Sequence, residues 1–395
     1  MFRKTLAALF LTASAAAAQD TAISDMIAAD GLAAAEAKLS ADQSTPTQQF
    51  ALGGVRFLRA IEKTLQTRWR LGMNTDFSEL PVLRLPVPAN ETPDPFTPGA
   101  ITQLFEVLNT DLASAAEPLS SISDTDAVDL PIRLTDLWFD INMNGSRDEG
   151  EGVAEVGGIA LTGRPTDIIE SPVIHFDTAD AAWLAAYTHF LSAFGELLQA
   201  FDPTEQIARV SEASAAMAAL GDESGYSNAL DYQFGTHIDR VAIILMTLNQ
   251  QPDATHTRAA HAHLVQMIAH NEKLWARVAA ETDNKGEWIP NDNQQQALGL
   301  EVPEGTGETW QAVLADAKAL LNGDKLIPYW RLREGAGLNL QKMFHDPVPV
   351  DLVEWVHGIA LLPFAEEGER VTPDNWFRFE RMMRGDALLF VAFLN

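Results

Sequence analysis

The sequence of 395 residues contains no cysteine. This absence excludes a disulfide framework, a thiolate zinc site, an iron–sulfur cluster and covalently attached haem. A chain of this length does not need disulfide bonds, because it can bury a large apolar core.

Apolar runs long enough to cross a bilayer are also missing from the body of the chain. The longest ones, Val241 to Met246 and Leu388 to Leu394, are far shorter than the roughly 20 residues that a membrane-spanning helix needs. At the N-terminus, Arg3 and Lys4 precede a short apolar run and then small residues up to Ala18. This pattern is typical of a secretory signal peptide. We therefore predict that residues 1–18 are removed and that the mature protein is periplasmic or secreted.

Positive charge is scarce. The chain has 27 lysines and arginines against 55 aspartates and glutamates, which gives a net charge of −28. Such a surface repels nucleic acid and anionic lipid and attracts cations, so we expect no nucleic-acid partner and no membrane span.

Apolar residues recur mostly at helical spacing, so the fold class is predicted to be mainly α. Thr97 with Pro98, and Asp177 with Asp180, look like helix starts. The predicted helices cover about 47–70, 97–112, 177–198, 204–219, 228–249, 254–281, 307–322, 350–361 and 373–394.

Two stretches interrupt this pattern and divide the chain. Prolines between residues 77 and 98 exclude a helix and predict an extended segment on the surface. Residues 123–176 are predicted to form a loop-and-strand insertion, because 152–163 and 171–176 show alternation and glycine punctuation. The expected regions are thus 19–122 and 177–395, both helical, with the insertion 123–176 between them.

Residues 140–151, DINMNGSRDEGE, have the spacing of a cation-binding loop. A calcium ion takes six to eight oxygens, and a short chain can supply them when alternate side chains point inward around a sharp turn. Gly145 permits the turn. The predicted ligands are the side chains of Asp140, Asn142, Asn144, Asp148 and Glu151 and the backbone carbonyl of Ser146.

These twelve residues resemble the calcium loop of EF-hand proteins, D-x-[DN]-x-[DN]-G-x₅-E. The resemblance implies a bound Ca²⁺ and covers only this loop. Arg147 departs from it, since an aliphatic residue that pairs with a partner loop is usual there. A short helix is expected to enter the loop within residues 132–139, but the glycines after Glu151 predict no exiting helix. The stretch is therefore expected to be a half EF-hand, a static structural site rather than a sensor.

Histidines supply the second candidate. His256, His263 and His270 recur every seven residues on one predicted helix, with His261 between them. Seven helical residues rise about 10 Å, so no two of the three can bind one ion without a partner from another helix. A stripe of surface or interface histidines is the favoured interpretation.

The residues around His237 suggest an alternative function. Gly235 and His237 resemble the G-x-H-x-x-E motif of imelysin-like periplasmic proteins, which are linked to iron uptake. However, Arg240 stands in place of the glutamate ligand, and Asp239 lies one position early.

The sequence thus predicts an exported calcium-binding protein with a binding or scaffolding role and no identified catalytic residues. The alternative is a periplasmic enzyme or an imelysin-like metal-uptake protein with a pocket around His237, Asp239 or His357.

Overall fold

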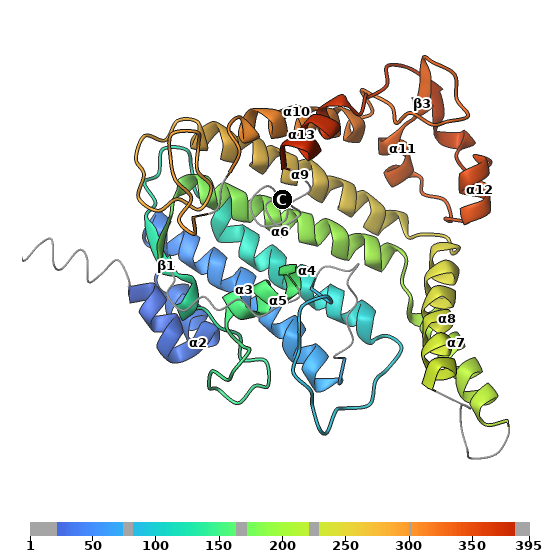
Figure 1. Cartoon of the computed structure of the whole chain (residues 1–395), viewed down its shortest axis with the longest axis horizontal. Helices are drawn as coiled ribbons and strands as arrows, with labels where there is room; N and C mark the ends of the chain where they lie inside the picture. Colours follow the sequence, from blue (N-terminus) through green and yellow to red (C-terminus); the bar gives the residue numbers. More distant parts are fainter. Residues whose placement is uncertain (1–21, 74–81, 163–171, 221–228, 300–301, 384–395) are drawn as a thin grey trace, which may run out of the picture.

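The structure is a computed structural model that describes residues 22–73, 82–162, 172–220, 229–299 and 302–383. It is mainly helical, as predicted (Figure 1). In its N-terminal half the long helices are α2 (Ala22–Ala41), α3 (Pro46–Arg70), α4 (Ala100–Ser120) and α6 (Thr178–Ala200). The later helices are α7 (Thr204–Ala218), α8 (Ala229–Leu248), α9 (Ala254–Val278), α10 (Thr306–Leu321), α11 (Leu340–His345), α12 (Leu352–His357) and α13 (Asp374–Met383).

Helix starts follow local capping chemistry. The Asp177 carboxylate accepts the N–H groups of Ala179 and Asp180, while the Asp180 carboxylate accepts the N–H of Asp177, which confirms the predicted start of α6. The helix start predicted at Thr97 and Pro98 is wrong, because helix α4 begins at Ala100. Thr97 instead accepts the Ala100 N–H through its carbonyl, in a turn before the helix.

The C-terminal predictions are partly confirmed. The helix predicted at 350–361 is shorter, since Gly358 adopts a left-handed conformation and ends α12 at His357. The helix predicted at 373–394 is α13 up to Met383, and residues 384–394 lie outside the described residues, as does the predicted signal peptide.

Short strands form two small sheets. β1 (Leu130–Arg133) pairs antiparallel with β2 (Val173–Phe176), which confirms the strand predicted at 171–176. β3 (Ala336–Leu338) pairs with β4 (Ala365–Glu367).

The strand predicted over 152–163 is wrong, because residues Val153–Thr162 form helix α5. The prediction that no helix leaves the loop is wrong for the same reason, since α5 begins two residues after Glu151. The Glu155 carboxylate, in the first turn, accepts the N–H groups of Gly150 and Gly152 and so favours a helix start there. The entering helix predicted within 132–139 is also wrong: the chain leaves β1 and makes only a 3₁₀ turn, η1 (Leu134–Asp136).

The proline-containing stretch is not helical over residues 82–98, as predicted, and residues 77–81 lie outside the described residues. It does not run only over the surface, because Val82 and Leu83 are buried in the core. The buried Arg68 guanidinium donates to the carbonyls of Val82 (3.0 Å) and Leu85 (2.6 Å), which satisfies this inserted backbone.

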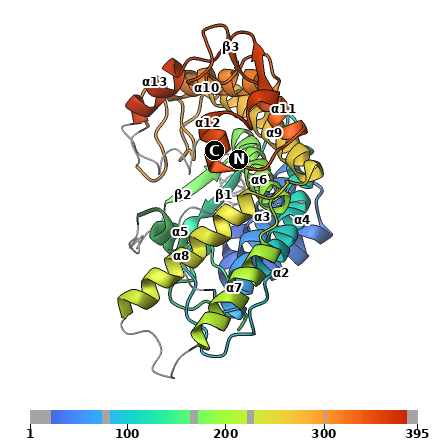
Figure 2. The same cartoon turned by 90° about the vertical axis from the view of Figure 1, so that its right-hand side faces the viewer.

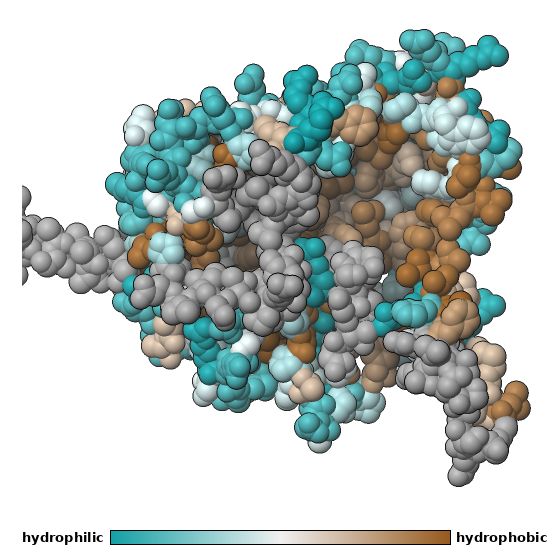
Figure 3. Space-filling model, in the orientation of Figure 1, coloured by the Kyte–Doolittle hydropathy of each residue, from teal (hydrophilic) through white to brown (hydrophobic). Residues whose placement is uncertain are grey.

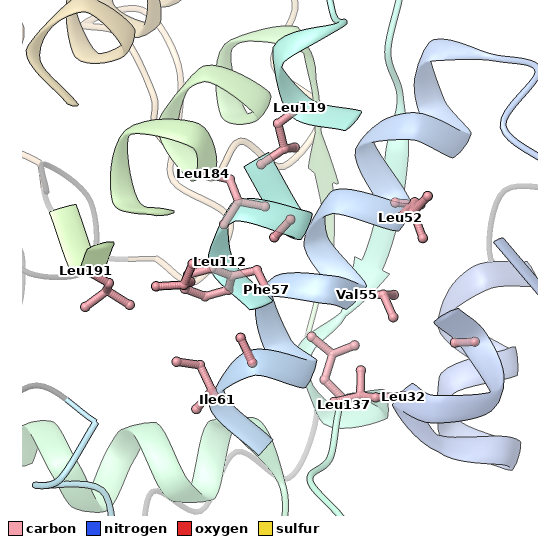
Figure 4. Packing of buried hydrophobic residues seen from close by; sticks show 14 of the residues in the cluster. Leu32, Leu52, Val55, Phe57, Ile61, Leu112, Leu119, Leu137, Leu184 and Leu191 are labelled. Carbon is pink, nitrogen blue, oxygen red and sulfur yellow. The ribbon is translucent and has the colours of Figure 1, made fainter. Parts of the chain in front are cut away.

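Three hydrophobic clusters make up the interior. The largest joins α2, α3, α4, β1 and α6, and Figure 4 shows labelled leucines of α2, α3, α4 and α6 in this cluster. A second cluster joins the other face of α6 to α9, α10 and α13. A small third cluster is formed by Leu338 of β3 with Leu361 and Phe364, which follow α12. α7 and α8 project from this body (Figure 2). Among the described helices, none is long and apolar enough to cross a membrane.

Candidate metal centre

The two ends of the predicted loop are joined by the backbone. Trp138 and Gly152 form an antiparallel bridge. On either side of it, the Phe139 N–H donates to the Glu151 carbonyl (2.8 Å) and the Val153 N–H donates to the Leu137 carbonyl (2.9 Å). Residues 140–151 therefore leave and return at one neck, between η1 and α5.

Helix α3 holds the first residue of the loop. The Asp140 N–H donates to Glu62 Oε1 (2.7 Å), and Gln66 Nε2 donates to the Asp140 carbonyl (2.8 Å). Glu62 is 1% exposed and also accepts from Arg59. Burial raises the pKa of the Glu62 carboxyl. The loop is thus fixed to the main core at its base, while its tip is exposed.

Inside the loop, backbone N–H groups orient the oxygens of the predicted ligands. Gly145, at a φ of 75°, donates to Asp140 Oδ2 (3.1 Å). Asn142 Oδ1 accepts the Asn144 N–H (3.1 Å), and Asn144 Oδ1 accepts the Ser146 N–H (2.8 Å). An oxygen that accepts one N–H keeps a second lone pair for a cation.

Backbone N–H groups hold Glu151, and side-chain amides hold Asp148. Glu151, which is 1% exposed, accepts the Ile141 N–H at Oε1 (2.9 Å) and the Asp148 N–H at Oε2 (2.8 Å). Asp148 Oδ2 accepts the side-chain amides of Asn142 (2.6 Å) and Asn144 (2.8 Å). The structure therefore brings the side chains of Asn142, Asn144 and Asp148 together, with Glu151 fixed below them.

Of the buried side-chain polar atoms in the loop, one has no hydrogen-bond partner. Asp140 Oδ1 is buried and makes no hydrogen bond. A buried carboxylate oxygen without a donor costs free energy, so this atom marks the place where a cation fits.

Arg147, the departure from the EF-hand pattern, has a local role. Its guanidinium donates to the Thr135 carbonyl (2.7 Å) and lies 3.5 Å from a Glu155 oxygen. It therefore ties the loop to η1 and α5 rather than to a second loop.

A second acidic group lies elsewhere. Among the residues that the structure describes, only Asp177, Glu281 and Glu287 place three ligand atoms within 4.8 Å of one another. The carboxylates of Asp140, Asp148 and Glu151 do not all lie within that distance of one another.

Protonation explains how the carboxyl groups of Asp177, Glu281 and Glu287 can lie so close together. Burial raises the pKa of Glu281 to about 8, and the charge of Asp177 adds to the effect. Burial also raises the pKa of the neighbouring Asp180 well above its usual range. The Glu281 carboxyl therefore holds a proton at neutral pH, which reduces the repulsion within the group without a metal ion.

The histidine stripe of α9 faces α6. His256 Nδ1 lies 2.6 Å from Glu196 Oε2, and His263 Nδ1 lies 2.9 Å from His189 Nδ1. Of the two predicted positions, surface or interface, the structure shows His256 and His263 at an interface between helices. His261 lies on another side, where its Nε2 is 2.7 Å from the Leu321 carbonyl.

The residues of the alternative function do not gather. His237 and His357 are exposed on α8 and α12, and the Asp239 carboxylate accepts a hydrogen bond from Ser214 (2.9 Å). None of the three lines either of two described cavities, of about 460 and 330 Å³.

The sequence reasoning missed the residues that support these sites, namely Glu62, Gln66, Glu155 and His189. One signal was available for Glu62: it falls on the buried face of α3, seven residues after Val55, where an unpaired acid is not expected. His189 had no such signal, because its position depends on how α6 meets α9.

Comparison with known proteins gives no relative. No protein-family model, no curated protein and no solved structure shows significant similarity to this chain. The EF-hand and imelysin resemblances rest on the quoted residues alone.

Proposed function

We propose that this is an exported protein in which residues 140–151 bind one structural Ca²⁺ ion. The observation that carries the proposal is the buried, unpartnered Oδ1 of Asp140, in a loop where backbone N–H groups orient the side-chain oxygens of Asn142, Asn144 and Glu151. The ligands are Asp140, Asn142, Asn144, Asp148 and Glu151 through their side chains and Ser146 through its carbonyl.

The ion acts as a clip. The neck of the loop connects η1 to α5, and its base is bonded to α3. A ligand that binds only the folded loop stabilises these connections by mass action. Because the entering element is a 3₁₀ turn, there is no pair of helices to swing apart, and the site is static.

The protein body has a binding or scaffolding role. Exposed apolar side chains gather on α8 (Phe234, Ile238, Val241, Ile244 and Leu245) and on and after α12 (Leu352, Val353, Val356, Ile359 and Leu362). The two groups are linked by a hydrogen bond from the Val350 N–H to the Leu248 carbonyl (2.7 Å). Figure 3 shows hydrophobic side chains on this side of the molecule, where Figure 1 places α8 and α12. Contiguous apolar surface of this kind is typical of interaction sites.

A thermal melt with calcium and with EGTA tests the ion. With a Kd of roughly 10⁻⁴ to 10⁻³ M, 10 mM calcium adds about 1.4–2.7 kcal/mol to the unfolding free energy, a shift of about 2–4 °C in a chain of this size. Asp140→Asn keeps the acceptor for Gly145 but removes the charge, and it should abolish the shift.

Two control variants locate the ion. Ser146→Ala should keep the shift, because Ser146 contributes only its backbone carbonyl. Glu281→Gln should keep it as well, because it changes only the second acidic group. Calcium should also slow tryptic cleavage after the exposed Arg147. An unchanged shift in Asp140→Asn, or its loss in Glu281→Gln, would place the ion outside the loop.

A further inference from the structure

His256, His263 and His270 of α9 cannot share a metal ion among themselves, but a further histidine on α6 lies beside two of them. These helices lie side by side in opposite directions, since the Asp253 N–H donates to the Ala200 carbonyl and Arg277 donates to the Thr178 carbonyl (Figure 1). His189 of α6 lies between His263 and His270. Its ring centroid is 5.2 Å from that of His263, and 5.4 Å from that of His270, with which it stacks at 20°.

We propose that His189 and His263 bind a divalent transition-metal ion through their Nδ1 atoms, with Cu²⁺ or Ni²⁺ preferred over Zn²⁺. This site is independent of the calcium loop. Imidazole suits these ions, whereas Ca²⁺ prefers oxygen ligands.

The distance between the two nitrogens selects the geometry. They are 2.9 Å apart. With metal–nitrogen bonds of about 2.0–2.1 Å, this separation corresponds to an angle of roughly 90° at the metal. Such an angle fits adjacent ligands of a square-planar or octahedral ion, as with Cu²⁺ and Ni²⁺. A tetrahedral Zn²⁺ site would need about 3.3–3.4 Å between the nitrogens.

The contact between the two rings leaves a nitrogen lone pair that a metal ion can use. In the contact seen here, one Nδ1 donates its proton and the other accepts it, so at least one ring has a free lone pair at Nδ1. Burial lowers the pKa of His189 to about 4 and lowers that of His263 as well. Binding therefore releases no net proton: the ring that carries its proton at Nδ1 changes to the tautomer with the proton at Nε2, and both Nδ1 lone pairs then face the ion.

Neighbouring charges place the ion at the His263 end of the group. Glu196 favours positive charge at His263, and it is held there by Asn109 (3.0 Å) and His256 (2.6 Å). Lys273 and Arg277 disfavour positive charge at His270. His270 is therefore a positioning residue that fixes the His189 ring by stacking, and water completes the coordination.

Copper titration of the untagged mature protein tests the site, followed by electron paramagnetic resonance at one equivalent of Cu²⁺. The spectrum of the wild type should show coupling to two nitrogens. His189→Gln and His263→Gln should each weaken binding by at least about tenfold, since loss of even a supporting partner costs a metal site that much. His237→Gln and His357→Gln, at exposed positions, should bind copper like the wild type.

Three results would overturn the proposal. One is equal copper affinity in the wild type and in the double variant His189→Gln/His263→Gln. Another is equal loss in the His237 or His357 variant. The third is a wild-type spectrum with fewer than two coupled nitrogens, which decides the question even if a variant does not fold. Asp140→Asn should keep copper binding, which separates this site from the calcium loop.

Discussion

Glu281 lies just after α9, beside Asp177 and Glu287, and its half-buried carboxyl has a pKa of about 8 instead of 4.5. A carboxyl whose pKa is raised on folding binds its proton more tightly in the folded state. Its contribution to stability is complete below pH 4.5 and is lost as the pH rises through 8.

We therefore predict that the unfolding free energy of the wild type falls between about pH 5 and pH 8, and that Glu281→Gln removes part of this fall. The difference should be on the order of 2 kcal/mol after allowance for screening by water. Urea unfolding at several pH values measures it. Glu272→Gln, on the exposed side of α9, should leave the fall unchanged, and the same result for Glu281→Gln would contradict the prediction.

The sequence identifies loop residues better than their supports. The order of Asp140, Asn142, Asn144 and Glu151 around Gly145 is a local pattern, and it is visible in twelve residues. Glu62 and Gln66 come from a segment more than seventy residues earlier, so their contacts with Asp140 depend on tertiary packing.

At the scale of helices, two adjacent glycines of α3 face different surroundings. A Cβ on Gly53 would lie 2.6 Å from the Leu119 side chain and 3.3 Å from the Ala115 carbonyl oxygen. A Cβ on Gly54 would meet only Leu184, at 3.8 Å. Gly53 thus sets how closely α3 approaches α4, whereas Gly54 leaves room.

Alanine at the two positions should act in opposite directions. Gly53→Ala should destabilise the protein by about 1–2 kcal/mol, because the clash with a buried leucine outweighs the gain in helix propensity. Gly54→Ala should stabilise it by up to about 1 kcal/mol, through propensity alone. Urea unfolding of both variants gives the comparison, and equal signs would show that packing around Gly53 is looser than described.

Helices were predictable where apolar spacing and a cap agree, as for α6 behind Asp177. The α5 prediction failed because glycines and a short alternation suggested a strand. The helix there begins where Glu155 accepts the N–H groups of Gly150 and Gly152, an interaction that the periodicity does not report.

At the scale of the whole molecule, Trp183 joins the two main cores. It packs against the cluster of α2, α3, α4 and α6 and also against that of α9, α10 and α13. Its ring stacks on Tyr187 at 5.9 Å and meets the edge of Trp288 at 5.5 Å. The two halves should therefore unfold together.

Trp183→Ala should cost about 3–5 kcal/mol and divide the single transition into two. Calorimetry at a fixed scan rate shows both effects. Trp330→Ala, at a side chain that is 68% exposed, should change the stability by less than about 0.5 kcal/mol. One sharp transition in Trp183→Ala would mean that the cores are coupled elsewhere.

Contacts at this scale were the least predictable. The spacing of His256, His263 and His270 shows that they share one side of a helix, but no local pattern indicates that His189 lies opposite. Their meeting depends on the packing of α6 against α9.

The neck below residues 140–151 has a further consequence. Because Phe139 and Val153 bond to Glu151 and Leu137, the entry and exit of the loop are already together before its tip adopts any shape. The exposed tip, residues 143–149, can thus be exchanged as a cassette: a shorter or longer insert would begin and end at the same two anchor points, and the helical body would not need rethreading.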